Sequence, residues 1–334
     1  MERTELELVR AIRKVLSGDA PGVVVPVGDD AAVVEPGRHQ GLLSTDLLVE
    51  GVHFELGATS AHDLGHKAIT VNVSDVAAMG GSPRYAIAGL IIPDSVEAAW
   101  VMELYGGMRE GADDYGMALV GGDTSGGDQA VIAVTVYGEV PKGKAVTRGG
   151  AHPGDVLVVT GSLGGSAAGL RVARAEAEEQ RELLSTDAGR ALLGVHERPV
   201  ARVGEGQALA GAGATAMIDL SDGLALDLAR LCEESEVGAR LRLADVPLHA
   251  ALEELEGRLG AAGLDLALHG GEDYELLATL PPKAVDGAAQ AITERYGTGL
   301  TAIGEITEGP AVVATSPDGS ESPLEPRGWD HFGR

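Results

Sequence analysis

The sequence of 334 residues contains one cysteine, Cys232, so no disulfide forms within the chain and no zinc site is built from cysteine thiolates. Cys232 lies in the apolar run LARLC, which predicts a buried thiol. Aromatic residues make up 3% of the chain, too few for a surface that stacks nucleic-acid bases. No apolar run approaches the roughly 20 residues of a membrane-spanning helix, and the polar N-terminus is unlike a signal peptide. We therefore expect a cytoplasmic protein.

Positive charge is also scarce. Lysine plus arginine number 25 against 51 aspartates and glutamates, which gives a net charge of −26. This balance argues against nucleic-acid or anionic-membrane partners, which are attracted by basic surfaces. It does not exclude a small polyanionic substrate that binds together with metal cations. A salt-rich cell interior is an alternative explanation for the acidic composition.

The length suggests two domains. The first half is read as a mixed α/β domain with strands near 41–49, 84–92, 117–121 and 129–140 and helices near 61–80 and 94–115. The turn-rich stretch PKGKAVTRGGAHPGD then marks a boundary, which predicts domains at 1–140 and 150–334. The second half alternates strands, near 155–161, 214–219, 239–243, 264–268, 274–280 and 300–306, with helices near 199–211, 222–235, 248–261 and 283–296. This alternation predicts an α/β layered domain.

Several aspartates lie inside or at the ends of apolar segments. Asp46 interrupts the strand LLSTDLLVE, and Asp75 takes the place of a core residue in the apolar stripe of helix 61–80. Any one of them alone is explained as a turn or cap residue. A buried cluster is not, because two like charges ~4 Å apart repel by roughly 4 kcal/mol at an effective dielectric of 20. We expect divalent cations to hold the group together. The acids concerned are Asp29, Asp30, Asp46, Asp75, Asp123, Asp219 and Asp222.

The chemistry of this group favours Mg²⁺, because its ligands are oxygen atoms and no histidine or cysteine cluster accompanies them. Glycines such as Gly28, Gly121 and Gly122 flank the acids, and bare backbone allows a phosphate to approach closely. The sequence contains no Walker A, protein-kinase or Rossmann motif. With so few lysines, metal ions must neutralise most of the charge of a nucleotide.

Eight motifs together resemble a known family. They are GDDAA, STDLLVEGVHF, KAITVNVSDVAAMGGSP, GGDTSGG, VTRGGAHPGDVLVVTG, IDLSDGL, GGEDYEL and GWDHF. In this order and spacing the chain is similar to the thiamine-monophosphate kinase family, of the aminoimidazole-ribonucleotide synthetase superfamily. The resemblance covers nearly the whole chain and is weakest at 172–195 and 307–325.

The resemblance implies a two-domain α/β (α+β) fold of the aminoimidazole-ribonucleotide-synthetase type. In such a fold the N-terminal mixed sheets of a homodimer form a shared barrel, and the C-terminal α/β layered domain completes the active site. The implied reaction converts ATP and thiamine monophosphate to ADP and thiamine diphosphate, with several Mg²⁺ ions.

The same resemblance assigns roles to residues of this chain. The Mg²⁺ ligands would be Asp30, Ser44, Thr45, Asp46, Asp75, Asp123, Asp219 and Asp222. The ATP contacts would be Tyr105, Gly122, Asp123, Arg148 and Ser221. Thiamine monophosphate would be held by His53, Glu272 and Trp329, although each of these three also has a structural explanation. Whether Asp29 binds metal or shapes its loop stays open.

No general base or covalent nucleophile is needed for this reaction. The second pKa of a phosphate monoester is near 6, so at pH 7 the acceptor is already mostly a nucleophile, and catalysis reduces to positioning and charge stabilisation. We expect direct in-line transfer without a phosphoenzyme. The alternatives are another ATP-dependent enzyme of the superfamily and a non-catalytic protein that binds Mg²⁺ or thiamine. Selenophosphate synthetases carry a reactive cysteine or selenocysteine near the N-terminus, which is absent here.

Overall fold

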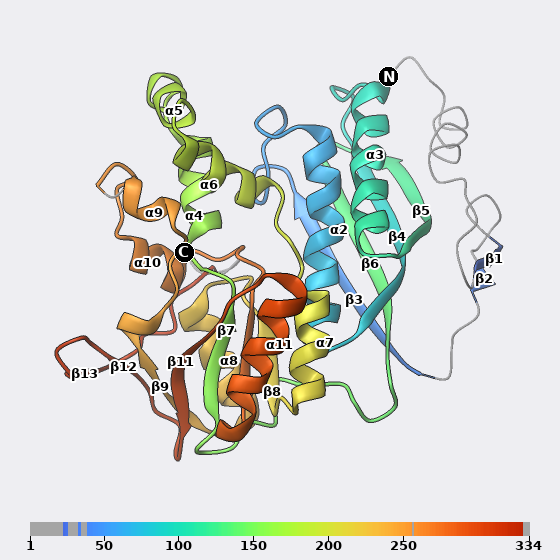
Figure 1. Cartoon of the computed structure of the whole chain (residues 1–334). Coiled ribbons are helices and arrows are strands. Elements are labelled where there is room, and N and C mark those ends of the chain that lie inside the picture. Colours follow the sequence, from blue (N-terminus) through green and yellow to red (C-terminus); the bar gives the residue numbers. More distant parts are fainter. Residues whose placement is uncertain (1–22, 26–32, 35–38, 256, 330–334) are drawn as a thin grey trace. The chain divides into compact units, whose positions relative to one another are not determined.

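The computed structural model describes residues 23–25, 33–34, 39–255 and 257–329 (Figure 1). These residues form two compact units. The first unit comprises the residues up to Val76 together with Gly81–Gly143, and the second comprises Ala77–Gly80 together with the chain from Lys144 onward. Within the described ranges, no helix is both long enough and apolar enough to cross a membrane.

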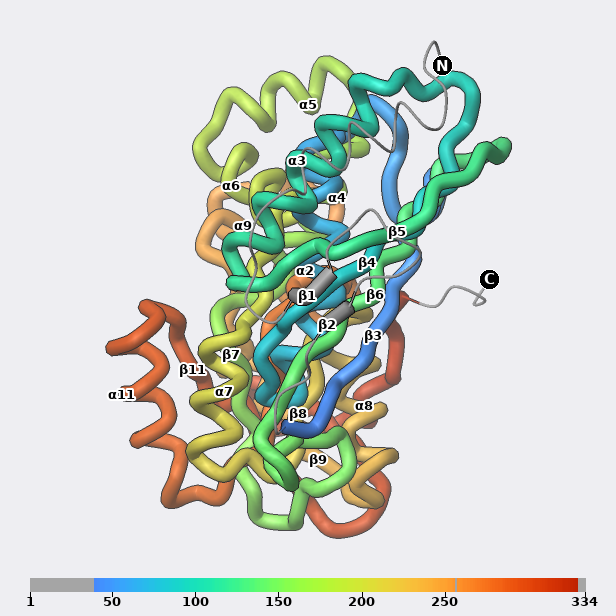
Figure 2. The backbone as a smooth tube through the Cα atoms, turned by 90° about the vertical axis from the view of Figure 1, so that its right-hand side faces the viewer, coloured from blue at the N-terminus to red at the C-terminus, as the bar shows by residue number. Residues whose placement is uncertain are grey.

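The first unit is built on a four-stranded mixed sheet of order β3-β6-β4-β5. Its strands are β3 (Gln40–Val49), β4 (Ser82–Ile92), β5 (Ala118–Gly126) and β6 (Val131–Val140). β6 pairs antiparallel with β3 and β4, whereas β4 and β5 are parallel. The helices α2 (Ala61–Ala78) and α3 (Ala98–Asp114) lie on one face of this sheet (Figure 2). The short strands β1 (Val23–Val25) and β2 (Val33–Val34) pair separately.

The two faces of this sheet differ in burial. Along β6, Ile132, Val134 and Val136 are buried against the helices, because successive side chains of a strand point to opposite faces. The other face exposes large apolar side chains, among them Leu43 at 77% and Leu47 at 56% on β3. Isolated exposed apolar residues are ordinary, but several on one flat sheet face mark an interaction surface.

The second unit contains a seven-stranded sheet of order β13-β12-β9-β11-β7-β10-β8, antiparallel except for the parallel pair β12–β9. The strands are β7 (Val156–Thr160), β8 (Ala216–Asp219), β9 (Gly238–Arg242), β10 (Leu276–Leu280), β11 (Leu300–Thr307), β12 (Val312–Thr315) and β13 (Glu321–Pro323). The helices are α4 (Gly165–Arg174), α5 (Ala177–Leu184), α6 (Asp187–Glu197), α7 (Val203–Ala212), α8 (Leu224–Ser235), α9 (Ala251–Glu254), α10 (Gly263–His269) and α11 (Val285–Tyr296), with 3₁₀ turns η1 (Leu243–Asp245) and η2 (Pro282–Ala284).

This sheet is apolar on both faces. On β7, Leu157 and Val159 belong to the core that includes α8, whereas Val158 between them belongs to the core formed with α7 and α11. A strand buried on both faces reads as a continuous apolar run, which the segment VLVVT is. The arrangement is the layered α/β domain that the sequence predicts. Cys232 is buried on α8 as predicted, and burial raises the pKa of its thiol to about 12.

One predicted strand and one predicted helix are wrong. The segment near 264–268 is the helix α10 and not a strand. In GLDLALH the leucines alternate, which favours a strand, but leucine and alanine favour helix. Leu266 packs among α4 and α9 residues, whereas Leu264 and Leu268 pack in the core that includes α8. The predicted helix near 248–261 is reduced to the single turn α9.

We predict that glycine at position 107 is required for the packing of α2 against α3. A Cβ atom there would collide with the main-chain carbonyl oxygen of His62 on α2. Gly107→Ala should therefore lower the free energy of unfolding by about 1–3 kcal/mol or more, measured by urea denaturation. The neighbouring Gly106→Ala is the control, because its Cβ would lie 3.5 Å from His62 Cδ2, an ordinary contact. Gly106→Ala should stabilise α3 by up to about 1 kcal/mol; equal losses for both variants would contradict this account.

Candidate active site

Strand β3 and helix α2 bring three of the predicted metal ligands together in the first unit. The Ser44 hydroxyl donates a hydrogen bond to the carboxylate of Asp75. The main-chain N–H of Asp46 donates to Asn72 Oδ1 at 3.0 Å, and Asn72, buried on α2, donates in turn to the Ala68 carbonyl at 3.0 Å. Asn72 and Asp75 lie one turn apart on α2. The side chains of Ser44, Asp46 and Asp75 are therefore grouped where β3 passes this helix.

Thr45 lies differently from its two neighbours. Its hydroxyl donates to the Val134 carbonyl at 2.9 Å and accepts from the Thr135 hydroxyl at 3.0 Å, both on β6. Because side chains alternate along a strand, the Thr45 side chain is on the sheet face opposite that of Ser44 and Asp46. The predicted metal role of Thr45 can then involve its main chain but not its hydroxyl.

The predicted nucleotide contacts of the first unit lie on β5 and α3. Gly122 passes so close to β4 that a Cβ atom would collide with the Ala88 carbonyl oxygen. The exposed Asp123 accepts the Thr124 N–H at 2.9 Å. Tyr105 is buried on α3, and this burial, with the Asp123 charge, raises the pKa of its phenol to about 12 despite a hydrogen bond with Thr124. Tyr105 therefore stays protonated at neutral pH.

His53 lies in the tight turn that follows β3. Its Nδ1 accepts the main-chain N–H of Val49 at 3.0 Å, and the His53 N–H donates to the Val49 carbonyl at 2.8 Å. An Nδ1 atom that accepts a hydrogen bond carries no proton, so the neutral ring is protonated on Nε2. The two hydrogen bonds with Val49 thus fix the His53 ring, and its Nε2–H is the donor on the side of the ring away from Val49.

Three motifs of the second unit meet at the loop between β8 and α8. The Glu272 N–H donates to the Ser221 carbonyl at 2.8 Å, and the Trp329 N–H donates to the Asp222 carbonyl at 3.0 Å. Gly271 has φ +73°, and a Cβ atom there would lie 2.6 Å from the Ser221 carbonyl oxygen. Only glycine allows this approach. The predicted residues Ser221, Asp222, Glu272 and Trp329 are therefore brought together by main-chain contacts, and the Trp329 side chain remains 44% exposed.

Asp222 is held by residues that the sequence reading did not single out. Its carboxylate accepts a hydrogen bond from Arg230 Nη1, which also binds Asp227 at 2.9 Å. Asp227 is fully buried and accepts the main-chain N–H groups of Asp222 at 3.0 Å and Gly223 at 3.1 Å. Burial raises the pKa of Asp227 to about 6, although Arg230 opposes this shift. The signal in the sequence is an acid in the first turn of α8, where the N–H groups of a helix start favour negative charge.

Glu272 and its neighbours have an unusual backbone. Glu272 has φ +59° and Tyr274 has φ +50°, a region that is rarely populated by residues other than glycine, asparagine and aspartate. Between them, Asp273 accepts the N–H groups of Gly164 at 2.8 Å and Ser166 at 3.2 Å, at the start of α4. The Glu272 carboxylate lies 3.5 Å from His196 Nδ1 on α6. Anchoring of Asp273 thus fixes the direction in which Glu272 leaves the chain.

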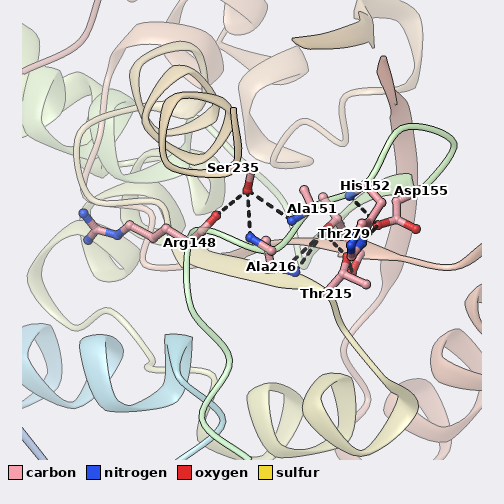
Figure 3. Close-up of polar contacts among 9 residues, drawn as sticks. Arg148, Ala151, His152, Asp155, Thr215, Ala216, Ser235 and Thr279 are labelled. Carbon is pink, nitrogen blue, oxygen red and sulfur yellow. Dashed lines mark hydrogen bonds and ion pairs between the residues drawn. The ribbon is translucent and has the colours of Figure 1, made fainter. Parts of the chain in front are cut away.

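The loop that carries Arg148 is held by Ser235, the last residue of α8 (Figure 3). The Ser235 hydroxyl accepts the N–H groups of Gly150 at 3.0 Å and Ala151 at 3.1 Å, and it donates to the Arg148 carbonyl at 2.7 Å. A Cβ atom at Gly150 would collide with the Thr215 carbonyl oxygen. The Arg148 side chain extends away from this cluster (Figure 3), and it is exposed.

The donor atoms of the two units fit a hard cation. Ser44, Asp46 and Asp75 offer oxygen ligands at a half-buried position, and Asp219 is buried at the end of β8. Asp29 and Asp30 lie outside the described residues. Within the part of the chain that the structure describes, no three His, Cys, Asp or Glu side chains by themselves form a metal site. The predicted metal roles therefore stay predictions.

We predict that Asp273 makes the stability of the second unit depend on pH. Burial raises the pKa of its carboxyl to about 7, against about 3.9 in the unfolded chain. Between these values the folded state holds a proton that the unfolded state has lost, so the contribution of Asp273 to stability falls as pH rises from about 4 to 7. The free energy of unfolding of the wild type minus that of Asp273→Asn should show this fall. The exposed Asp286→Asn is the control and should give a flat difference; a flat difference for Asp273→Asn as well would contradict the prediction.

Both units match domains of a known protein family. Residues 28–140 match the AIR synthase related protein, N-terminal domain, and residues 152–316 match the C-terminal domain of the same name. The thiamine-monophosphate kinase of Bacillus subtilis is 37% identical over 314 residues, which cover 93% of this chain and 94% of that protein.

Solved structures agree with this match. The crystal structure of the thiamine-monophosphate kinase from Stenotrophomonas maltophilia K279a has a TM-score of 0.80 and 33% identity, covering 96% of this chain and 98% of that one. AaThiL complexed with AMPPCP and TMP has a TM-score of 0.76 and 33% identity, covering 99% of both chains. Sequence and fold match over almost the full length of this chain and of each protein compared. The chain therefore belongs to the thiamine-monophosphate kinase family of AIR synthase related proteins.

Proposed function

We propose that this protein transfers the γ-phosphoryl group of ATP to thiamine monophosphate and so forms thiamine diphosphate. The observation that carries the proposal is the similarity over 99% of the chain to a protein solved with the ATP analogue AMPPCP and with TMP. The grouping of acidic side chains on β3 and α2, and of Ser221, Asp222, Glu272 and Trp329 in the second unit, supports it.

The proposed Mg²⁺ ligands are all oxygen donors. We assign them to Asp30, Ser44, Thr45, Asp46, Asp75, Asp123, Asp219 and Asp222. When bound, Mg²⁺ neutralises phosphate oxygens, for which a chain with lysine at only five positions has few cationic side chains. The protein orients these ligands in advance: the Ser44 hydroxyl holds the Asp75 carboxylate, and Arg230 holds that of Asp222 until a cation competes for it.

The proposed substrate contacts are the ones that the family resemblance implies. We assign ATP to Tyr105, Gly122, Asp123, Arg148 and Ser221. In thiamine monophosphate, the aromatic rings would stack on Trp329, and its polar groups would meet the Glu272 carboxylate and the His53 Nε2–H. The stacking surface is available because the indole is half exposed.

The proposed chemical step is a direct in-line transfer. An oxygen of the acceptor phosphate attacks the γ-phosphorus, the bond to the bridging oxygen of ADP breaks, and no residue of the chain becomes phosphorylated. The acceptor is mostly a dianion at pH 7, so no general base is assigned. His53 is assigned to substrate binding in this scheme and not to phosphate transfer.

We also propose a homodimer that forms through the first unit. The support is the apolar sheet face of β3 and β4, where Leu43, Leu47, Ile87 and Ile91 are exposed. Side chains of this size and number are energetically costly in water, since burial of each contributes about 1.5–3 kcal/mol. A second copy of the same face is the self-complementary partner that a twofold axis provides. A cytoplasmic location remains our prediction.

The decisive experiment is product analysis after incubation of the full chain with ATP, Mg²⁺ and thiamine monophosphate. Thiamine diphosphate and ADP should form in equal amounts, and free thiamine should not be phosphorylated. Asp46→Asn should lower turnover by at least about 100-fold, because it removes a carboxylate from the proposed metal group. Asp94→Asn, at an exposed acid of the same unit, should keep wild-type turnover. Binding of both substrates without product would favour the non-catalytic alternative, and product from another acceptor would favour another enzyme of the superfamily.

We predict that Ser235 positions Arg148 for ATP. Ser235→Ala removes three hydrogen bonds from the loop and should raise the KM for ATP by about fivefold or more, since each bond contributes about 1 kcal/mol. The kcat and the KM for thiamine monophosphate should change little. Ser235→Thr keeps the hydroxyl and should recover most of the affinity. Ser185→Ala removes an exposed hydroxyl that bonds the Glu182 carbonyl on α5 and is the control. An unchanged KM for ATP in Ser235→Ala would show that the loop needs no such support.

A further inference from the structure

A pocket in the second unit is lined by none of the residues assigned above. It has a volume of about 590 Å³ and lies among α4, α5, α10 and the segment 258–260. Three arginines line it: Arg171 and Arg174 on α4, and Arg258 in the segment before α10. In a chain with a net charge of −26, such a group reverses the prevailing sign of charge locally.

The guanidinium groups retain unused donors. Arg171 donates from Nη1 to the Leu259 carbonyl at 3.1 Å, which fixes its position and leaves its other N–H groups available. Arg258 Nη2 lies 3.5 Å from the Glu182 carboxylate, a long and exposed ion pair that contributes little. Arg174 has no hydrogen bond or ion pair with any described residue. A carboxylate, Glu179 on α5, also lines the pocket.

The geometry favours an anion over a structural role for these arginines. Arg171 and Arg174 are one turn apart on α4, so both reach the same side of the helix. Buried apolar side chains of Leu183, Leu259 and Leu266 line the pocket beside them. The planar guanidinium fork matches the oxygens of phosphate in pairs, and the apolar side chains match a small hydrocarbon or ring. The volume is within the range of small-molecule sites.

We propose that this pocket binds a small organic phosphate with an apolar body, at a site distinct from the one that transfers the phosphoryl group. Arg171 and Arg174 hold the phosphate, Arg258 adds positive charge, and Glu179 limits the affinity by repulsion. The site does not depend on the proposed kinase activity, because none of its residues takes part in it.

The test uses the full chain, phenyl phosphate as the probe, EDTA to remove divalent ions, and low ionic strength, where surface charge is least screened. Calorimetry should show saturable binding of one phenyl phosphate per chain. The double variant Arg171→Gln/Arg174→Gln should weaken binding at least tenfold, as expected for the loss of charge-assisted hydrogen bonds. Glu179→Gln should tighten binding by about twofold or more, because it removes the repelling charge.

Two control variants locate the probe. Arg190→Gln removes an exposed arginine of α6 that pairs with Asp187 and should leave the dissociation constant unchanged. Arg148→Gln should also leave it unchanged; a loss there would place the probe in the nucleotide site and overturn the proposal. No saturable binding by the wild type, or equal affinity in the double variant, would equally overturn it. Product formation from thiamine monophosphate is measured in parallel and should remain normal in the double variant, so the two proposals fail independently.

Discussion

The structure depends on keeping carboxylates in place where water is partly excluded. A buried charge is tolerated only when donors or a counter-charge satisfy it, and the acids of this chain obtain these locally. Asp227 accepts two main-chain N–H groups and an Arg230 bond, Asp273 accepts two N–H groups at the start of α4, and Asp75 accepts the Ser44 hydroxyl. Those same contacts fix loops and strand ends, so the arrangement that satisfies the charges also orders the proposed site.

Main-chain contacts extend this order to the residues that would touch substrate. Glu272 and Trp329 both donate their N–H groups to the loop between β8 and α8, and glycine at position 271 permits the approach. Because main-chain bonds do not depend on side-chain identity, these contacts hold the loop without using the side chains of Glu272 and Trp329. Ser235 does the same for the loop of Arg148 by bonding only to its backbone.

Much of this could be predicted from local patterns. The two-unit α/β fold follows from apolar runs and turns. The apolar stripe of α2 predicts Asp75 at a core position, and in the structure it is half-buried. Period-two alternation could also have separated Thr45 from Asp46. Contacts between distant segments could not be predicted: Asp273 meets the start of α4 across 109 residues of sequence. The prediction of a strand at α10 was wrong because alternating leucines fit a strand as well as a helix, and only the packing of Leu266 against α4 and α9 residues and of Leu268 in the core with α8 decides.

Helix α4 links the proposed catalytic loop to the arginine-lined pocket. Its first turn is capped by Asp273, next to Glu272, and its later turns carry Arg171 and Arg174. Gly270 lines the pocket and precedes the segment in which Glu272 adopts a positive φ. Helix α4 and Gly270 therefore border the pocket and also lie next to the segment that carries Glu272. Since a strained backbone persists only where its surroundings hold it, the two N–H groups that bind Asp273 at the start of α4 keep Glu272 in this conformation.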